Sequence, residues 1–186
     1  MGAGTLVAAA QRAFAAHKFD EAENGFKQVL NMDEKNVWTL GNLAAAQLEN
    51  GHLADAEKNL SKALAADPND AFNLYLWGIL KLRQNKSSEA LDALSRSAKL
   101  EPKSPETQNN LGVALSRQGQ REAAETALRK AIELSPDYGS AHLNLAVVYA
   151  NQNPPYLALA RYHYDKAIKN GQSRNPDLEK ILGKNP

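Results

Sequence analysis

The hydrophobic positions of this chain recur with the spacing of amphipathic helices, and the whole pattern returns with a constant period of about 34 residues. Three columns of identical residues share this period: Pro68, Pro102 and Pro136; Leu60, Leu94 and Leu128; and Ala56, Ala90 and Ala124. A period of this length accommodates two helices joined by a turn, and the proline ends the second helix of each pair. The sequence therefore predicts a series of antiparallel helical hairpins without β-strands.

Five repeats follow from this frame. We expect residues 1–186 to form one domain with repeats at about 3–36, 37–70, 71–104, 105–138 and 139–172. Asn175-Pro176-Asp177 combines a helix-capping residue with a proline at the first helical position. A short final helix at 175–183 is therefore expected to cap the last repeat.

The turn in the middle of the fifth repeat is longer than the others. Residues 153–156 insert two extra residues there, so the register of the second helix is open by two positions. In the shifted register the inward residues are Ala160, Tyr164 and Ala167, and in the unshifted register they are Ala158, Tyr162 and Asp165.

A fourth column places a large residue before a small one in the first helix of each repeat. Its members are Leu43-Ala44, Trp77-Gly78, Leu111-Gly112 and Leu145-Ala146. Small residues at such positions let two helix backbones approach closely.

Together these columns resemble the tetratricopeptide repeat (TPR) family, and the resemblance covers nearly the whole chain. It is strongest in repeats two to four. It implies an all-α fold, a right-handed superhelical solenoid of five repeats with a C-terminal capping helix. It also implies a protein–protein interaction module, a scaffold or adaptor that binds a partner polypeptide in its concave groove.

Composition narrows the choice of partner. Twenty-two Lys and Arg against 21 Asp and Glu leave a net charge of +1, so no global field favours nucleic acid or anionic lipid. No apolar stretch reaches the roughly 18 residues that a membrane span needs. We therefore expect a protein partner, with no nucleic acid and no membrane insertion, and the compartment, cytoplasmic or periplasmic, stays open.

Signs of catalysis are missing from the sequence. The chain has no cysteine, and its four histidines lack the spacing of a metal site. Gly-rich phosphate loops and the Gly-x-Ser-x-Gly motif are absent as well. We expect no enzyme, no catalytic residue, no metal and no cofactor.

In the TPR family the first helix of each repeat lines the ligand-binding surface. Carried over to this chain, the resemblance implies a set of partner-binding residues: Trp38, Asn42, Phe72, Tyr75, Leu76, Ile79, Asn109, Asn110, Val113, Arg117 and Asn144. The expected binding energy is concentrated at Trp38, Phe72, Tyr75 and Ile79, which should form one patch.

Two features of this set have more than one interpretation. Residues 72–82 are apolar on nearly all sides, which fits either contact with neighbouring helices or cover by a ligand, a second copy or the chain's own termini. Asn42, Asn110 and Asn144 share one repeat position, where they could hold a peptide backbone or bond one helix to the next. The alternative function is a self-associating assembly element that uses the same apolar groove.

Overall fold

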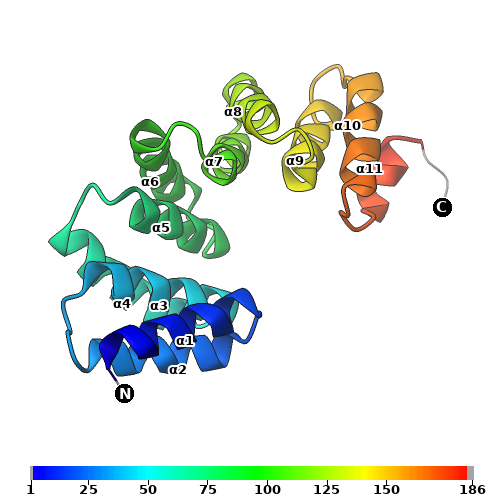
Figure 1. The fold of residues 1–186 in the computed structure, drawn as a ribbon. Helices are drawn as coiled ribbons and strands as arrows, with labels where there is room; N and C mark the ends of the chain where they lie inside the picture. The colour runs from blue at the N-terminus through cyan, green and yellow to red at the C-terminus, as the bar shows by residue number, and fades with distance from the viewer. Residues whose placement is uncertain (1, 184–186) are drawn as a thin grey trace. The chain divides into compact units, whose positions relative to one another are not determined.

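The computed structural model describes residues 2–183, and over this range it contains eleven helices and no strand. The helices are α1 (Ala3–Ala15), α2 (Phe19–Leu30), α3 (Val37–Glu49), α4 (Leu53–Ala66), α5 (Ala71–Arg83), α6 (Ser87–Leu100), α7 (Pro105–Arg117), α8 (Arg121–Leu134), α9 (Gly139–Ala150), α10 (Leu157–Lys169) and α11 (Pro176–Ile181). Consecutive helices from α1 to α5 and from α6 to α10 pack as in a TPR solenoid, so the predicted fold class is confirmed (Figure 1).

The chain divides into two compact units between Asn85 and Lys86. The N-terminal unit contains α1 to α5 and the C-terminal unit contains α6 to α11. The first helix of each repeat, α1, α3, α5, α7 and α9, begins at the residue that the sequence frame gives. The single domain itself stays a prediction.

Capping residues fix where the first helices begin. Asn36, Asp70 and Ser104, which follow one another at intervals of one repeat, each accept a bond from the backbone N–H three residues later. Such a cap satisfies one of the free N–H groups at a helix start. The repeat therefore encodes the starts of α3, α5 and α7 as well as their apolar faces.

Two apolar clusters form the core of the N-terminal unit. In the first, Phe26 and Ala22 of α2 pack with Ala10 of α1 and Leu43 of α3. The second joins α3, α4 and α5 through buried residues that include Ala44, Ala45, Leu48, Ala56, Leu60, Leu76 and Leu80. Because α3 contributes to both clusters, it connects the first repeat to the helices that follow.

In the C-terminal unit one continuous cluster runs from α7 to α11. Ala160, Tyr164 and Ala167 of α10 are buried, whereas Ala158, Tyr162 and Asp165 are exposed. Helices α4, α6 and α8 begin at a constant interval, and α10 begins two positions later than that interval predicts. The fifth repeat therefore has the shifted register.

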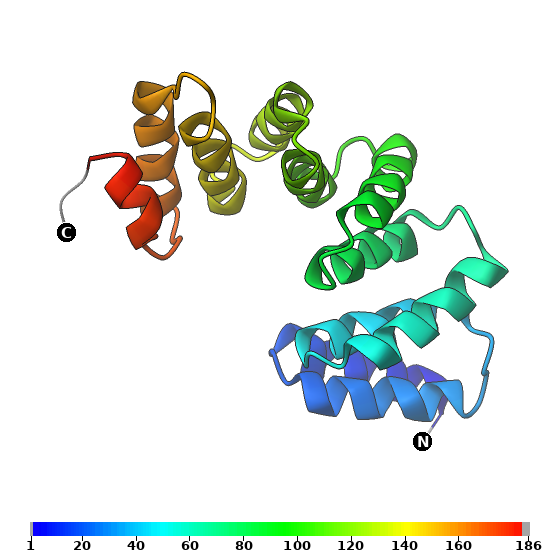
Figure 2. The same ribbon diagram turned by 180° about the vertical axis from the view of Figure 1, so that it is seen from behind.

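Helix α11 covers the end of this cluster. Its Leu178, with Leu182 just after it, is buried in the core. The Tyr164 hydroxyl donates to the Glu179 carboxylate at 2.9 Å and accepts from the Asn175 backbone N–H at 2.9 Å. Figure 2 shows α11 beside α10, as expected of a capping helix.

The turn inside each of the first four repeats needs a left-handed residue, and only two of the four are glycine. The φ angles are +58° at His17, +78° at Gly51, +59° at Asn85 and +74° at Gly119. Each of these positions lies one repeat after the previous one, so the turn is repeated with the helices. A left-handed conformation is costly for a residue with a Cβ.

His17→Gly should therefore raise the free energy of unfolding by about 0.5–1 kcal/mol, since the relief of backbone strain exceeds the added entropy of the unfolded chain. Gly119→Ala is the matched control and should lower it by about 1 kcal/mol, because its Cβ would meet no atom within 4 Å and only φ is unfavourable. Urea denaturation measures both. A stabilising Gly119→Ala would contradict this account of the turn.

Candidate partner-binding grooves

An apolar groove lies on the face of the N-terminal unit formed by α1, α3 and α5, with a volume of about 260 Å³. We call it the aromatic groove, and its lining residues are Phe14, Asn42, Ala45, Leu48, Glu49, Phe72, Tyr75, Leu76 and Ile79. Five of them, Asn42, Phe72, Tyr75, Leu76 and Ile79, are predicted partner-binding residues. Four of these five residues lie at three-and-four spacing on one face of α5, and Asn42 comes from α3.

The apolar residues of α5 are buried to different degrees. Leu76 is 5 % exposed and belongs to the core shared with α3 and α4. Phe72 is 41 % exposed, and Tyr75 and Ile79 are half-buried. Contact between neighbouring helices therefore accounts for Leu76, while Phe72 presents much of its ring to solvent.

One rim of the aromatic groove is charged. Arg83 of α5 forms an ion pair with Glu49 of α3 at 2.9 Å and also donates to the Leu48 carbonyl oxygen. Both charged side chains are partly exposed, so the ion pair itself adds little stability. Its effect is to hold the ends of α3 and α5 together beside the apolar residues.

Trp38 does not line the aromatic groove. Its indole packs edge-on against Phe26 of α2, with the ring centroids 6.1 Å apart, although 45 % of the residue stays exposed. The place of Trp38 in the expected patch therefore stays a prediction.

The three asparagines at one repeat position have two kinds of partner. Asn144 donates to the side-chain oxygen of Asn109 at 2.9 Å, which bonds α9 to α7. Asn42 donates to the Trp38 carbonyl oxygen and Asn110 to the Glu106 carbonyl oxygen, each within its own helix. Asn109 and Asn144 thus fit the helix-to-helix interpretation. The Asn42 side-chain oxygen remains an acceptor at the aromatic groove.

A second groove of about 220 Å³ lies on the C-terminal unit, along α7 and α9. It contains three predicted residues, Val113, Arg117 and Asn144. Asn109 is buried, and neither Asn109 nor Asn110 lines this groove. Fewer large apolar side chains are exposed here, so the aromatic groove is the stronger candidate site.

The aromatic groove has four lining residues that the predicted set omits: Phe14, Ala45, Leu48 and Glu49. Phe14 stands one repeat before Leu48, which is itself a lining residue, so the repeat frame contained the signal. The first repeat matches the pattern less well, and its contribution is therefore easily overlooked.

Two of the histidines, the buried His142 and the half-buried His163, form a pair in the C-terminal unit. The Nδ1 atoms of His142 and His163 are 2.8 Å apart, and the two rings stack with centroids 5.1 Å apart. His142 Nε2 lies 3.0 Å from the Pro136 carbonyl oxygen and must donate to it. In the neutral pair, His163 Nδ1 therefore donates to His142 Nδ1.

The surroundings of this pair change the protonation of His163. No group of three or more potential metal ligands occurs among residues 2–183. Burial, with the nearby His142 and Arg129, lowers the pKa of His163 from 6.5 to about 4. His163 therefore stays neutral at pH values somewhat below the ordinary pKa of histidine.

The pair predicts how stability depends on pH. Because the pKa of His163 is lower in the folded state, its contribution is fully present above pH 6.5 and is lost as the pH falls toward 4. Between pH 7 and pH 5 the free energy of unfolding should fall by about 1–2 kcal/mol from this group. His163→Phe should remove that fall in thermal melts, whereas His17→Gln should keep it. An unchanged pH profile in His163→Phe would refute the assignment.

A second buried polar cluster connects repeats one and two. Glu23 of α2 bonds to Asn50 at 3.0 Å, to His52 at 3.0 Å and to Gln47 of α3 at 3.4 Å, and it forms an ion pair with Lys27 at 2.7 Å. Burial alone would raise the pKa of Glu23, but these partners hold it at about 2. The carboxylate therefore stays charged and satisfies the polar atoms between the two hairpins.

Comparison with known proteins agrees with the repeat frame. Tetratricopeptide repeat models match residues 13–74 and 75–120, and a TPR repeat model matches residues 115–153. The chain belongs to the tetratricopeptide repeat family, a family of protein-binding helical repeats that is generally non-catalytic. No curated protein matches the chain.

Solved structures with the same fold include three TPR proteins. A crystal structure of MamA is 25 % identical, with a TM-score of 0.70 over 87 % of this chain and 93 % of MamA. PilF of Pseudomonas aeruginosa is 19 % identical, with a TM-score of 0.80 over 98 % of this chain and 85 % of PilF. YrrB, described as a TPR protein with an unusual peptide-binding site, is 20 % identical, with a TM-score of 0.69 over 95 % of this chain and 88 % of YrrB.

One further finding concerns membranes. Among the described residues no helix combines the length and the apolar character that crossing a bilayer requires.

Proposed function

We propose that this chain is a scaffold or adaptor that binds a segment of a partner polypeptide in the aromatic groove and performs no catalysis. The observation that carries the proposal is the exposure of Phe72 beside the half-buried Tyr75 and Ile79, on a groove open to solvent. Large aromatic side chains in such a place supply most of the binding energy of a protein interface.

The groove has the composition that a peptide segment needs. Phe14, Phe72 and Tyr75 offer apolar area, while the Asn42 side-chain oxygen can accept a bond from a peptide N–H. The Arg83–Glu49 ion pair at the rim offers both signs of charge. Apolar area would provide the affinity, and the polar groups would fix the direction of the bound chain.

A second candidate function is self-association through the same surface. The net charge of +1 does not keep copies of the chain apart, and an exposed apolar groove can pair with its own copy. The partner in that case is a second solenoid, and the chain acts as an assembly element.

Light scattering over a dilution series separates the two candidates. The scaffold function predicts a molar mass near 20.3 kDa at all concentrations. It also predicts that the immobilised chain captures a partner and that its Phe72→Ala, Tyr75→Ala variant does not. A molar mass that rises with concentration in the wild type, and not in that variant, would favour self-association. Equal capture by both chains would place the binding surface elsewhere.

A further inference from the structure

The N-terminal unit has a second groove on a different face of α3. Asn42, Ala45 and Leu48 face the aromatic groove, whereas Leu40, Leu43 and Gln47 form the floor of a depression between α2 and α4. This depression consists of two hollows of about 460 and 450 Å³ that share Lys62 as a lining residue. We call it the lysine groove.

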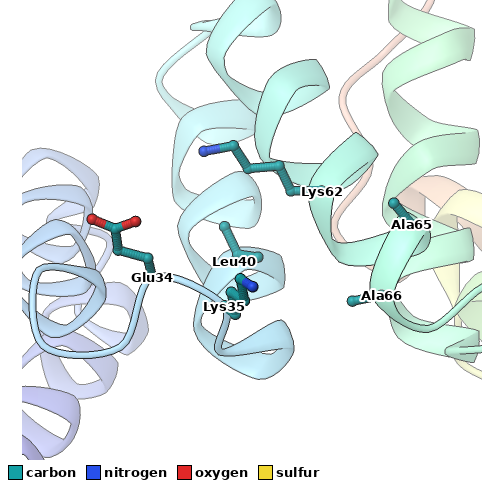
Figure 3. Close-up of a pocket in the computed structure, with 6 residues that line it drawn as sticks. All are labelled: Glu34, Lys35, Leu40, Lys62, Ala65 and Ala66. Carbon is teal, nitrogen blue, oxygen red and sulfur yellow. The ribbon is translucent and has the colours of Figure 1, made fainter.

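Its walls come from three segments. Helix α2 contributes Lys27 and Leu30, and the loop before α3 contributes Glu34 and Lys35. The wall formed by α4 consists of residues at three-and-four spacing, which is one face of a helix: Asp55, Lys58, Asn59, Lys62, Ala65 and Ala66. Figure 3 shows the hollow at one end, with Lys62 extending from α4 and Leu40 between Lys62 and Lys35 in this view.

Positive charge predominates in this groove. It is lined by four lysines and by two carboxylates, Glu34 and Asp55, which lie in different hollows. Lys27 is paired with Glu23. Lys35, Lys58 and Lys62 are exposed and have no carboxylate within 4.0 Å in the part of the chain that the structure describes.

The N-terminal unit as a whole is acidic, so the positive charge of the lysine groove is a local feature. Residues 1–85 contain eight Lys and Arg and ten Asp and Glu, a net charge of −2. A long polyanion such as nucleic acid would be repelled by the unit as a whole and would gain nothing from the apolar surface of Leu30, Ala65 and Ala66. A ligand with both carboxylates and aliphatic side chains fits the lining better.

The dimensions favour an extended peptide. From Asp55 to Ala66 the α4 wall is about 16 Å long at 1.5 Å per residue, which is the length of about five residues of extended chain. Lys58 and Lys62 are one helical turn apart, about 6 Å, which is close to the roughly 6.7 Å between alternate residues of an extended strand. Carboxylates at alternate positions would thus meet both lysines, while the residues between them face Leu30 on the α2 wall.

We propose that the lysine groove is a second docking site, which binds an extended acidic segment of a partner protein whose Glu or Asp residues alternate with aliphatic residues. This inference goes beyond the function of the aromatic groove and does not depend on it. The carboxylates would pair with Lys58 and Lys62, and the aliphatic residues would cover the half-buried Leu30 and the exposed Ala65 and Ala66. The chain would then hold two partner segments on two faces of α3.

A fluorescein-labelled hexapeptide of alternating Leu and Glu is the probe, and fluorescence anisotropy is the measurement. The wild type should bind it saturably, and binding should weaken several-fold when salt rises from about 0.05 to about 0.3 M. Lys58→Glu with Lys62→Glu should weaken it at least about 10-fold. Lys99→Glu with Lys103→Glu, which changes the net charge equally on the C-terminal unit, should leave it within about twofold. The Leu-Gln peptide should not bind.

Several outcomes would overturn the proposal: no saturable binding of the Leu-Glu peptide, equal weakening by both pairs of substitutions, or equal binding of a hexathymidylate. Loss of binding in Phe72→Ala but not in the Lys58, Lys62 variant would show that the peptide binds in the aromatic groove. Self-association that depends on Lys58 and Lys62 and excludes the peptide would make a second copy the occupant. Circular dichroism melting checks that each variant is folded, as expected because both lysines are exposed.

Discussion

Replacing Gly112 with Val should lower the free energy of unfolding of the C-terminal unit by about 2–3 kcal/mol. Gly112 lies on α7 where this helix contacts α8, and a Cβ there would be 2.5 Å from Leu128 Cγ and 3.2 Å from the Ala124 carbonyl oxygen. Leu128 is fully buried, and the Ala124 carbonyl oxygen is backbone and cannot move aside as a side chain can. The helices would have to separate, and the apolar contacts of the hairpin would be lost.

Thermal and urea denaturation, followed by circular dichroism, measure this effect. Gly4→Val is the matched control, because a Cβ at Gly4 meets no atom within 4 Å, and it should change stability by less than about 0.5 kcal/mol. A Gly112→Val chain as stable as the wild type would mean that α7 and α8 do not pack at this distance.

The other large effect concerns binding. Phe72→Ala and Tyr75→Ala should each weaken the binding of a partner in the aromatic groove by about 2 kcal/mol or more, roughly 30-fold. Phe72 presents much of its ring to solvent in the free chain and would lose that exposure on binding. The measurement is isothermal calorimetry with the captured partner segment, alongside a melt of each variant.

Trp38→Ala is the matched control for these variants. It removes an exposed aromatic side chain of similar size that lies outside the aromatic groove and packs on Phe26. The affinity should change little, although the melting temperature should fall as the contact with α2 is lost. If Trp38→Ala weakens binding as much as Phe72→Ala while both variants stay folded, the partner-binding surface extends beyond the aromatic groove to Trp38.

The 34-residue repeat predicts much of this fold, because each position at which a residue type recurs has the same structural role in every repeat. Proline ends α4, small residues such as Gly112 mark close helix contacts, and Ser104 begins α7. The same frame gives the residues of α3 and α5 that face the aromatic groove. Periodicity assigns a side chain to a face of a helix, and this is enough where all neighbours repeat as well.

The repeat pattern does not predict details that depend on the orientation of particular side chains. The direction of Trp38 is set by Phe26 in another helix, and the pairing of His142 with His163 needs the two-residue shift in the fifth repeat. The lysine groove arises between α2 and α4, which do not follow each other in sequence, so no local pattern indicates it. These features follow from contacts between helices, which only the structure provides.

Site-specific photo-crosslinking tests the central claim most directly. A benzophenone-bearing amino acid in place of Phe72 would stand in the aromatic groove, and the same amino acid in place of Tyr162, which is 55 % exposed on α10, provides the control position. With the partner present, the chain labelled at position 72 should give a covalent adduct of the partner's mass and the chain labelled at position 162 should give none. An adduct at position 162 without one at position 72 would contradict the claim that the aromatic groove binds the partner.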